Sequence, residues 1–534
     1  MSLLSVEALS LSIGGTPILH DVSLAVGPGE ILGVIGESGS GKSMTALAIM
    51  GLLPRGSRAR GRILLSGRDL MPLSDREMCR IRGAEIGMVF QEPMTALNPL
   101  RTIGDQVAET VLQHRAAGRG EAMAIARAAL ERVELPPDRF PPGRYPHELS
   151  GGQRQRVVIA MAIALRPKLL ICDEPTTALD VTTQAQILKL LKGLVAEQGM
   201  GMMFITHDLA VVAGLADRIA VMRDGRVVED GPTRQLFAAM RHPYTRALRD
   251  ASAHRPQRSR RSPGTPLLEV RGAVRDYRLP RRSLLGPVPV FRAVDHVSLT
   301  IRRGENLGLV GESGCGKSTL TRAILGLEPL QGGVIELDGQ RIDAAAGVPP
   351  ALRRRMQVVF QDPYGSFDPR WRVGRLVAEP FHLVRPRPGA AEIERAVAEA
   401  LEAVGLSAAD RRRFPHEFSG GQRQRIAIAR ALVTRPELIL LDEAVSALDV
   451  RVRAQILDLL AELSERFGLS YLFISHDLSV VRAITDRVLV MKAGRIVEEG
   501  ETEQVFAAPR HAYTRELLAA TPRLEDALAA PAEG

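Results

Sequence analysis

The sequence predicts an α/β fold made of two tandem copies of one domain, and three observations indicate it. Two glycine-rich segments of nearly identical sequence occupy residues 36–43 and 311–318. Further matching motifs follow both segments in the same order, and His476 lies 269 residues after His207. Short apolar runs alternate with helical stretches, which is typical of a mostly parallel sheet covered on both faces. Copies of about 250 residues are too long for solenoid repeats, so each copy is a domain.

The expected elements of the first copy follow in chain order. Residues 30–35 are an apolar strand bounded by glycines, and the glycine-rich loop after it leads into a helix over 44–50. The polar, Ala/Arg/Glu-rich stretch from 91 to 150 predicts a helical subdomain. Residues 169–172 and 202–206 are again fully apolar and predict two more buried strands.

The repeat also sets the expected domain boundaries. The first domain spans residues 1–249 and the second spans 267–520, with a tail over 521–534. Residues 250–266 are rich in Pro, Ser and Arg and lack apolar periodicity, so they predict a flexible linker.

Composition excludes several classes of protein. The chain has 534 residues, 45% of them hydrophobic and 25% charged, which rules out disorder, collagen and coiled coil as the main description. The net charge of +9 forms no basic stripe, and aromatics are only 4%, so no nucleic acid is expected as a partner. Three distant cysteines give neither a disulfide framework nor a metal motif. No run is long enough to span a membrane, so any membrane association is expected to be peripheral.

The glycine-rich segments have the pattern GxxxxGK[ST] of a loop that binds phosphate. Glycines let backbone N–H groups turn toward phosphates, the following helix presents its positive end, the lysine adds charge and the serine offers a hydroxyl to Mg²⁺. Two matches, each between an apolar strand and a helix, leave chance a negligible explanation. The expected nucleotide-binding residues are Gly36, Glu37, Ser38, Gly39, Ser40, Gly41, Lys42 and Ser43, and Gly311, Glu312, Ser313, Gly314, Cys315, Gly316, Lys317 and Ser318.

Acidic pairs end an apolar strand in each copy, Asp173-Glu174 in the first and Asp442-Glu443 in the second. Ligands of open α/β sheets lie at the carboxyl ends of strands, so these carboxylates are expected to face the phosphates. The aspartates, with Ser43 and Ser318, are predicted to hold Mg²⁺. The glutamates are predicted to orient the attacking water.

Histidines follow another apolar strand in both copies. Alone, a histidine there is more often a cap or turn residue, but His207 and His476 occur in matched register and are expected to contact the γ-phosphate. Gln91 and Gln361 also follow strands, where a lone glutamine carries little information.

Taken together, these motifs resemble those of an ATP-binding cassette (ABC) domain, over nearly the whole chain. The specific part is the signature SGGQ, since most proteins with a phosphate-binding loop lack it. The signature residues are Ser150, Gly151, Gly152 and Gln153, and Ser419, Gly420, Gly421 and Gln422. The resemblance implies two P-loop NTPase domains in tandem, each with a RecA-like mixed sheet, an antiparallel β subdomain and a helical subdomain.

The resemblance further implies that the copies form a head-to-tail sandwich with two MgATP at the interface. Each P-loop would face the signature of the other copy, whose serine and N–H groups would stabilise γ-phosphate charge. Asp180 and Asp449 would communicate across the interface. Gln91 and Gln361 would take part in metal binding and catalysis and would link the interface to a partner. Both copies keep their key groups, so two hydrolytic sites are expected.

Two departures from the family pattern stand out. Phe418 replaces the usual leucine before the second signature and is apolar as well. The family stacks adenine on an aromatic residue upstream of the P-loop. Tyr277 is predicted to serve the second site, whereas the first copy has residues 11–13, Leu-Ser-Ile, and no aromatic.

Terminal motifs narrow the resemblance. HPYTRAL at 242–248 and HAYTREL at 511–517 look like those of the ATPases of peptide and nickel importers, including fused versions serving glutathione or microcin-like peptides. This implies an energy-coupling ATPase on the cytoplasmic face of the inner membrane, with two permease subunits and an extracytoplasmic solute-binding protein as partners. Many such ATPases carry a cysteine cluster near this motif; none is present here, so no iron–sulfur centre is expected.

Three alternatives remain open at this stage. A soluble tandem-cassette translation factor usually has a long charged helical linker, and a DNA-repair ATPase would need zinc-binding cysteines and large insertions. Sugar-importer fusions are an alternative within the family, disfavoured by the terminal motifs.

Overall fold

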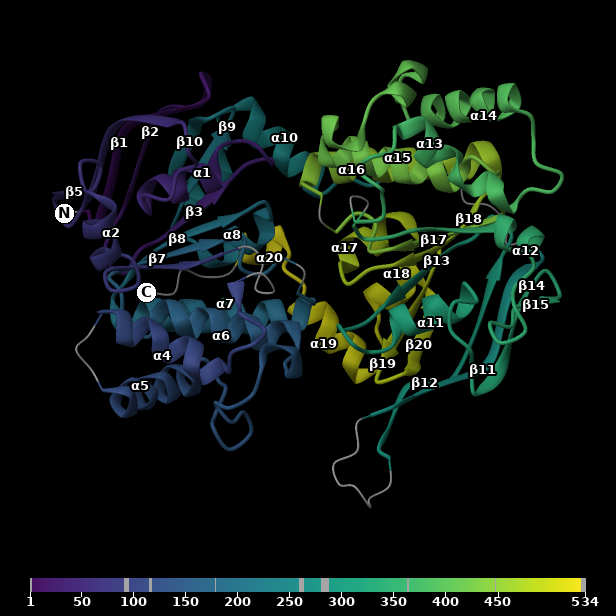
Figure 1. Ribbon diagram of the computed structural model, residues 1–534, viewed down its shortest axis with the longest axis horizontal. Coiled ribbons are helices and arrows are strands. Elements are labelled where there is room, and N and C mark those ends of the chain that lie inside the picture. Colours follow the sequence, from purple (N-terminus) through teal and green to yellow (C-terminus); the bar gives the residue numbers. More distant parts are fainter. Residues whose placement is uncertain are drawn as a thin grey trace.

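A computed structural model describes residues 2–90, 96–114, 118–177, 179–258, 264–279, 288–362, 365–446 and 448–529. The two copies form two similar bodies, here called the first cassette (2–252) and the second cassette (264–529), which lie side by side (Figure 1). Each contains a six-stranded core sheet, a four-stranded antiparallel sheet and surrounding helices.

The core sheets have the same strand order in both cassettes. Neighbouring strands are parallel except for the last hairpin, β9–β10 and β19–β20, which is antiparallel. In spatial order the first core sheet is β10 (Arg226–Pro232), β9 (Arg218–Arg223), β3 (Ile31–Ile35), β8 (Gly201–Thr206), β7 (Leu169–Asp173) and β6 (Ile86–Val89). The second is β20 (Arg495–Glu501), β19 (Arg487–Lys492), β13 (Asn306–Val310), β18 (Ser470–Ile474), β17 (Leu438–Asp442) and β16 (Met356–Val359).

The antiparallel sheets are built from the segments before and after each P-loop. The first is β2 (Thr16–Val26), β1 (Leu4–Ile13), β4 (Ser57–Leu65) and β5 (Arg68–Asp69). The second is β12 (Val290–Arg302), β11 (Pro266–Arg278), β14 (Gly332–Leu337) and β15 (Gln340–Arg341).

Helices surround the sheets. Those of the first cassette are α1 (Lys42–Ile49), α2 (Asp75–Ile81), α4 (Ile103–His114), α5 (Arg119–Arg132), α6 (Gly151–Ile163), α7 (Val181–Gln198), α8 (Leu209–Leu215), α9 (Thr233–Ala239) and α10 (Pro243–Ser252). Those of the second are α11 (Lys317–Ile324), α12 (Pro350–Arg355), α13 (Val373–Ala378), α14 (Ala390–Ala403), α15 (Gly420–Leu432), α16 (Val450–Phe467), α17 (Leu478–Ile484), α18 (Thr502–Ala507), α19 (Ala512–Ala520) and α20 (Leu524–Ala529).

Alternation along the core strands divides the apolar core into two layers. In β3, Leu32 and Val34 pack with the antiparallel sheet and α1, whereas Ile31 and Ile35 pack with the helices on the other face. Every residue of β3 is buried, as expected for a parallel strand covered on both sides. The predicted α/β tandem fold is therefore confirmed, and α4 and α5 supply helices in the predicted helical region.

The two cassettes contact each other reciprocally. The C-terminal helix α10 of the first cassette packs on α16 of the second, and its counterpart α19 packs on α7, the counterpart of α16. Figure 1 shows this head-to-tail relation, with α10 reaching α16 and α19 reaching α7. Because each contact has its partner in the other half, the cassettes are related by an approximate twofold axis.

Two chain segments add to this interface. In the predicted linker, α10 continues to Ser252, and His254 and Arg258 then pair with Asp458 and Asp486 of the second cassette at 2.7 Å each. In the predicted tail, α20 packs on α8, where Leu524 and other residues of α20 join the core of the first cassette.

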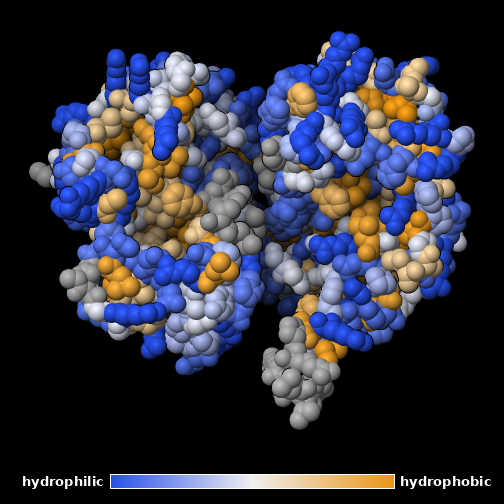
Figure 2. All heavy atoms as spheres, viewed as in Figure 1, coloured by the Kyte–Doolittle hydropathy of each residue, from blue (hydrophilic) through white to orange (hydrophobic). Residues whose placement is uncertain are grey.

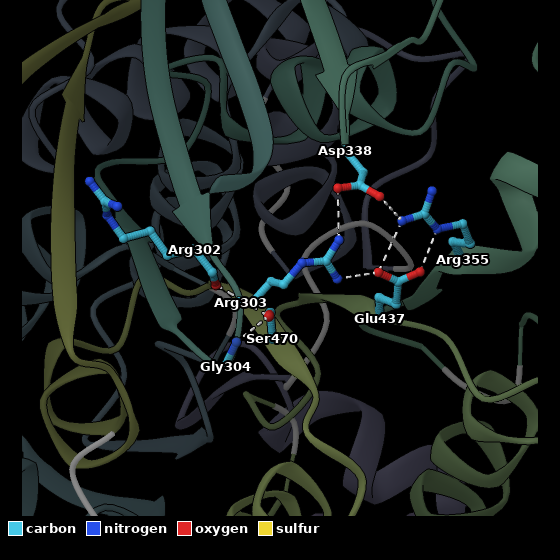
Figure 3. A network of polar contacts seen from close by, with 7 residues as sticks. All are labelled: Arg302, Arg303, Gly304, Asp338, Arg355, Glu437 and Ser470. Atoms are coloured by element: carbon cyan, nitrogen blue, oxygen red, sulfur yellow. Dashed lines mark hydrogen bonds and ion pairs between the residues drawn. The ribbon is translucent and has the colours of Figure 1, made fainter. Parts of the chain in front are cut away.

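Figure 3 shows a charged network that joins the two sheets of the second cassette. Arg303 after β12 and Arg355 at the end of α12 both pair with Glu437, which precedes β17. Both arginines also pair with Asp338 in the β14–β15 turn, at 2.8 and 2.7 Å. The hydrogen bond from Arg355 is the main cause that lowers the pKa of Glu437.

Candidate functional site

Each P-loop connects the central core strand to the helix that follows it. The loop after β3 ends at Gly41, the N-cap of α1, with φ +101°. A Cβ there would lie 2.5 Å from the Leu19 side chain, and one on Gly316, in the second loop, would lie 2.2 Å from the Ala293 carbonyl oxygen. Only glycine fits these positions, so the backbone turns as a phosphate-binding loop requires.

The P-loop lysines are folded back onto their own loops. Lys42 Nζ donates to the carbonyl oxygens of Gly36 and Glu37, both at 2.8 Å. Lys317 Nζ does the same to Gly311 and Glu312, at 2.7 and 2.8 Å. Burial lowers the pKa of Lys42, although the charges of Glu174 and Asp173 act in the opposite direction. These carbonyl contacts are ones that a bound phosphate can replace.

The serine after each lysine lies near the aspartate that ends a core strand. Ser43 Oγ donates to Asp173 Oδ1 at 3.1 Å, and Asp173 ends β7. Burial raises the pKa of Asp173 and of its counterpart Asp442 at the end of β17. A hydroxyl and a carboxylate in contact at a buried strand end are suitable oxygen ligands for Mg²⁺.

The glutamates after these aspartates pair with the histidines of the neighbouring strand. Glu174 Oε1 lies 3.3 Å from His207 Nδ1, and Glu443 Oε1 lies 3.2 Å from His476 Nδ1. Both glutamates have positive φ, +48° and +51°, a conformation that costs energy and is concentrated at functional sites. Burial alone would raise the pKa of Glu174, but the hydrogen bond and charge of His207 lower it.

The signature motifs begin helices. Ser150 caps α6 and forms a capping box with Gln153, and Ser419 and Gln422 do the same at α15. A Cβ on Gly152 would lie 2.3 Å from Thr183 Cγ2, so this glycine lets α6 approach α7. Within the described ranges, no hydrogen bond joins either signature serine to the opposite P-loop.

Near the P-loops, the cassettes contact each other through residues at the N-termini of α7 and α16. Asp180 caps α7 and accepts a hydrogen bond from the Ser313 N–H of the opposite P-loop at 3.4 Å. Asp449 caps α16, and its charge acts on Lys42 of the first P-loop. Asp180 thus contacts the P-loop of the other cassette, and Asp449 lies close enough to the opposite P-loop lysine for its charge to act on it.

The second residue of each P-loop also contacts the other cassette. Arg451 forms an ion pair with Glu37 at 2.9 Å, and Thr182 donates to Glu312 at 2.8 Å. Arg451 and Thr182 occupy equivalent positions, two residues after the capping aspartates. The sequence predicts nucleotide binding for both glutamates, but its motifs do not indicate these contacts across the interface.

The residue predicted to stack on adenine, Tyr277, lies in the antiparallel sheet of the second cassette. Tyr277 lies in β11, and its hydroxyl donates to Glu328 while the Arg275 guanidinium stacks 4.6 Å from the ring centroid. The pairing of β1 with β4 and of β11 with β14 places Ile13 at the equivalent position. The two cassettes therefore differ there as the sequence indicated. Gln361 is exposed just after β16, and Gln91 lies outside the described residues.

A cavity of about 570 Å³ lies between the cassettes. His207 and His476 both line it, together with Arg453 of α16. Figure 2 shows the two cassettes as separate lobes with a hollow between them on the face in view. The histidines of both candidate sites therefore border one shared cavity.

Comparison with known families identifies this arrangement. The family described as ABC transporter matches residues 19–177 and 294–446. A second family, described as oligopeptide/dipeptide transporter, C-terminal region, matches residues 228–271 and 497–533. The chain therefore belongs to the ABC transporter family, and it is an ATPase with two ATP-binding cassettes. No helix in the described part of the chain has the length and apolar character needed to cross a membrane.

Two relatives match this chain along most of their own length. The glutathione import ATP-binding protein GsiA of Escherichia coli (strain K12) is 49% identical over 542 residues, covering 95% of this chain and 87% of the relative. That of Salmonella typhimurium (strain LT2) is 49% identical over 539 residues, covering 94% and 86%. A solved structure of cbiO1 from Clostridium perfringens, part of the ABC transporter complex cbiONQ, is 30% identical with a TM-score of 0.40, covering 46% of this chain and 92% of that one.

Proposed function

We propose that the chain hydrolyses ATP at two composite sites and so energises the import of peptides or peptide-like solutes such as glutathione. In each site the P-loop of one cassette binds the phosphates, and the Ser-Gly-Gly of the other cassette closes over them. The reciprocal packing of α10 on α16 and of α19 on α7 is the observation that supports the composite arrangement.

Phosphate binding falls to the P-loops. The loop N–H groups and the N-termini of α1 and α11 attract phosphate oxygens. On binding, Lys42 exchanges its contacts to the Gly36 and Glu37 carbonyls for contacts to phosphate. Ser43 and Asp173 would hold Mg²⁺ in the first site, with Gln91, and Ser318 and Asp442 would do so in the second, with Gln361. The ion would neutralise phosphate charge.

Hydrolysis then depends on positioning. Glu174, whose lowered pKa keeps it ionised near neutral pH, accepts a hydrogen bond from the attacking water and orients it in line with the leaving group. His207 holds this carboxylate and contacts the γ-phosphate, and Glu443 and His476 have the same roles in the second site. The signature serine supplies a further donor to transition-state charge.

The importer assignment rests on the C-terminal regions. The oligopeptide/dipeptide transporter model matches the C-terminal region of both cassettes. The relatives named above are glutathione import ATP-binding proteins, and this chain aligns with most of their length. We infer two permease subunits and an extracytoplasmic solute-binding protein as partners, with this chain peripheral on the cytoplasmic face of the membrane. No observation favours the ribosomal alternative.

Co-purification tests the proposal. The tagged chain is isolated from gently solubilised membranes and its partners are identified by mass spectrometry. Two multi-span permeases and an extracytoplasmic solute-binding protein are the expected partners, with uptake of a peptide that depends on this chain and on all three of them. Ribosomal proteins in place of permeases would contradict the proposal.

A further inference from the structure

The terminal motifs place a tyrosine against each P-loop. His242 caps α10 through Nδ1, which accepts the Tyr244 N–H at 3.2 Å, and His511 accepts the Tyr513 N–H at 3.1 Å. Both tyrosines are buried, with 2% of their surface exposed. The His-x-Tyr spacing therefore fixes the first helical turn and directs the ring into the cassette.

Each tyrosine hydroxyl contacts the second residue of its P-loop. The Glu37 N–H donates to Tyr244 Oη at 3.0 Å, and the Glu312 N–H donates to Tyr513 Oη at 3.0 Å. The carbonyl oxygens of the same two glutamates accept from the P-loop lysines at 2.8 Å. One residue of each loop is thus held on one side by a tyrosine and on the other by the lysine that ATP must recruit.

The rings are fixed by cations at equivalent strand ends. The Arg223 guanidinium lies 5.1 Å from the Tyr244 ring centroid, and Lys492 Nζ lies 4.3 Å from that of Tyr513. Burial raises the pKa of Tyr244 to about 12, so the phenol is neutral at physiological pH.

The side chains of the same glutamates contact the other cassette, so each tyrosine is connected to that cassette through one residue. Glu37 pairs with Arg451, and Glu312 accepts from Thr182. In each half, these contacts connect the C-terminal helix, the P-loop and the N-terminus of the opposing helix through one glutamate.

We propose that Tyr244 and Tyr513 are positioning residues for ATP binding, each acting on the P-loop of its own cassette. By accepting the peptide N–H of the second loop residue, each hydroxyl holds that part of the loop in place before phosphate arrives, so less ordering is needed on binding. The proposal rests on the nucleotide sites proposed above. A merely structural role for the terminal helix would instead affect stability without selecting one site.

Site-resolved labelling of the full chain tests this role. Tyr244→Phe and Tyr513→Phe are titrated with 8-azido-ATP, and labelled peptides from the two cassettes are quantified by mass spectrometry. Loss of one hydrogen bond to the buried loop is expected to weaken labelling roughly fivefold to tenfold. Tyr244→Phe affects only the first site, and Tyr513→Phe only the second.

Tyr471→Phe is the matched control, because Tyr471 is also buried and its hydroxyl donates to the Leu460 carbonyl at 3.0 Å in the core of the second cassette. It is expected to leave both sites unchanged. His242→Ala keeps the Tyr244 hydroxyl but removes the cap, and is a second perturbation expected at the first site alone.

Equal weakening of both sites by Tyr244→Phe, or no more weakening than Tyr471→Phe causes, overturns the positioning role. Failure of the unsubstituted chain to label at either P-loop is a different result, which overturns the nucleotide sites themselves.

Discussion

The two P-loops contact the opposite cassette through different chemistry, and this difference predicts a site-specific response to salt. The Arg451–Glu37 contact is an ion pair, whereas its counterpart is a hydroxyl donated by Thr182 to Glu312. Arg451→Met removes the charge and keeps the stem, and Thr182→Val removes the hydroxyl and keeps the shape. The two variants are therefore a matched pair.

The magnitude follows from distance and exposure. Unit charges 2.9 Å apart attract by about 1.4 kcal/mol in water. The side chains are 42% and 29% exposed, so the value for exposed pairs, about 0.5–1 kcal/mol, applies. Arg451→Met is expected to lower kcat/KM for ATP roughly twofold to fivefold at 0.1 M salt.

Salt distinguishes the two variants. Between 0.1 M and 1 M salt the Debye length falls from about 10 Å to about 3 Å, so the ion pair weakens and the Arg451→Met defect shrinks toward none relative to the parent chain. The Thr182→Val defect, which reflects a hydrogen bond, is expected to persist. Steady-state ATPase assays of both variants and the parent at both salt concentrations make the test. Equal salt dependence, or no defect of Arg451→Met at low salt, would refute the reasoning.

Two further predictions concern stability, both measured by thermal or denaturant unfolding. Gly152→Ala forces a Cβ to within 2.3 Å of Thr183 and is expected to cost about 1–3 kcal/mol, whereas Gly193→Ala, in open space on α7, is expected to be neutral or to stabilise by up to about 1 kcal/mol; equal effects would contradict the packing argument. Glu437→Gln is expected to cost about 1 kcal/mol at pH 7, since its half-exposed pairs with Arg303 and Arg355 are screened. Because the folded-state pKa of Glu437 is lowered, its contribution is present above the unfolded value of about 4.3 and is lost as pH falls through the folded value. The gap between variant and parent therefore closes in acid, and a gap that widened would contradict the sign.

The fold and much of the candidate site could be predicted because their chemistry lies in short windows. Lys42 and Ser43 are adjacent, and Asp173 and Glu174 directly follow an apolar strand, so strand order alone brings them together. Because each motif occurs in both copies, each occurrence supports the interpretation of its counterpart. The observed α1 begins at Lys42, two residues before the predicted helix, because Gly41 rather than an apolar residue ends the loop.

Contacts between distant segments could not be read in the same way. Tyr244 contacts a loop 207 residues earlier, and Leu524 packs on the first cassette although it lies in the predicted tail. Residues so far apart in sequence leave no periodic pattern that would indicate their contact. The recurrence of His-x-Tyr in both copies was the one available hint, and it marked the family without indicating the P-loop.

Turnover of the glutamate variants tests the central claim, two hydrolytic sites in one chain. ATPase activity and bound nucleotide are measured for Glu174→Gln, Glu443→Gln and the double variant. The double variant is expected to keep ATP bound but to lose at least about a hundredfold in turnover, because neither site can orient water. Turnover that survived both substitutions would contradict it.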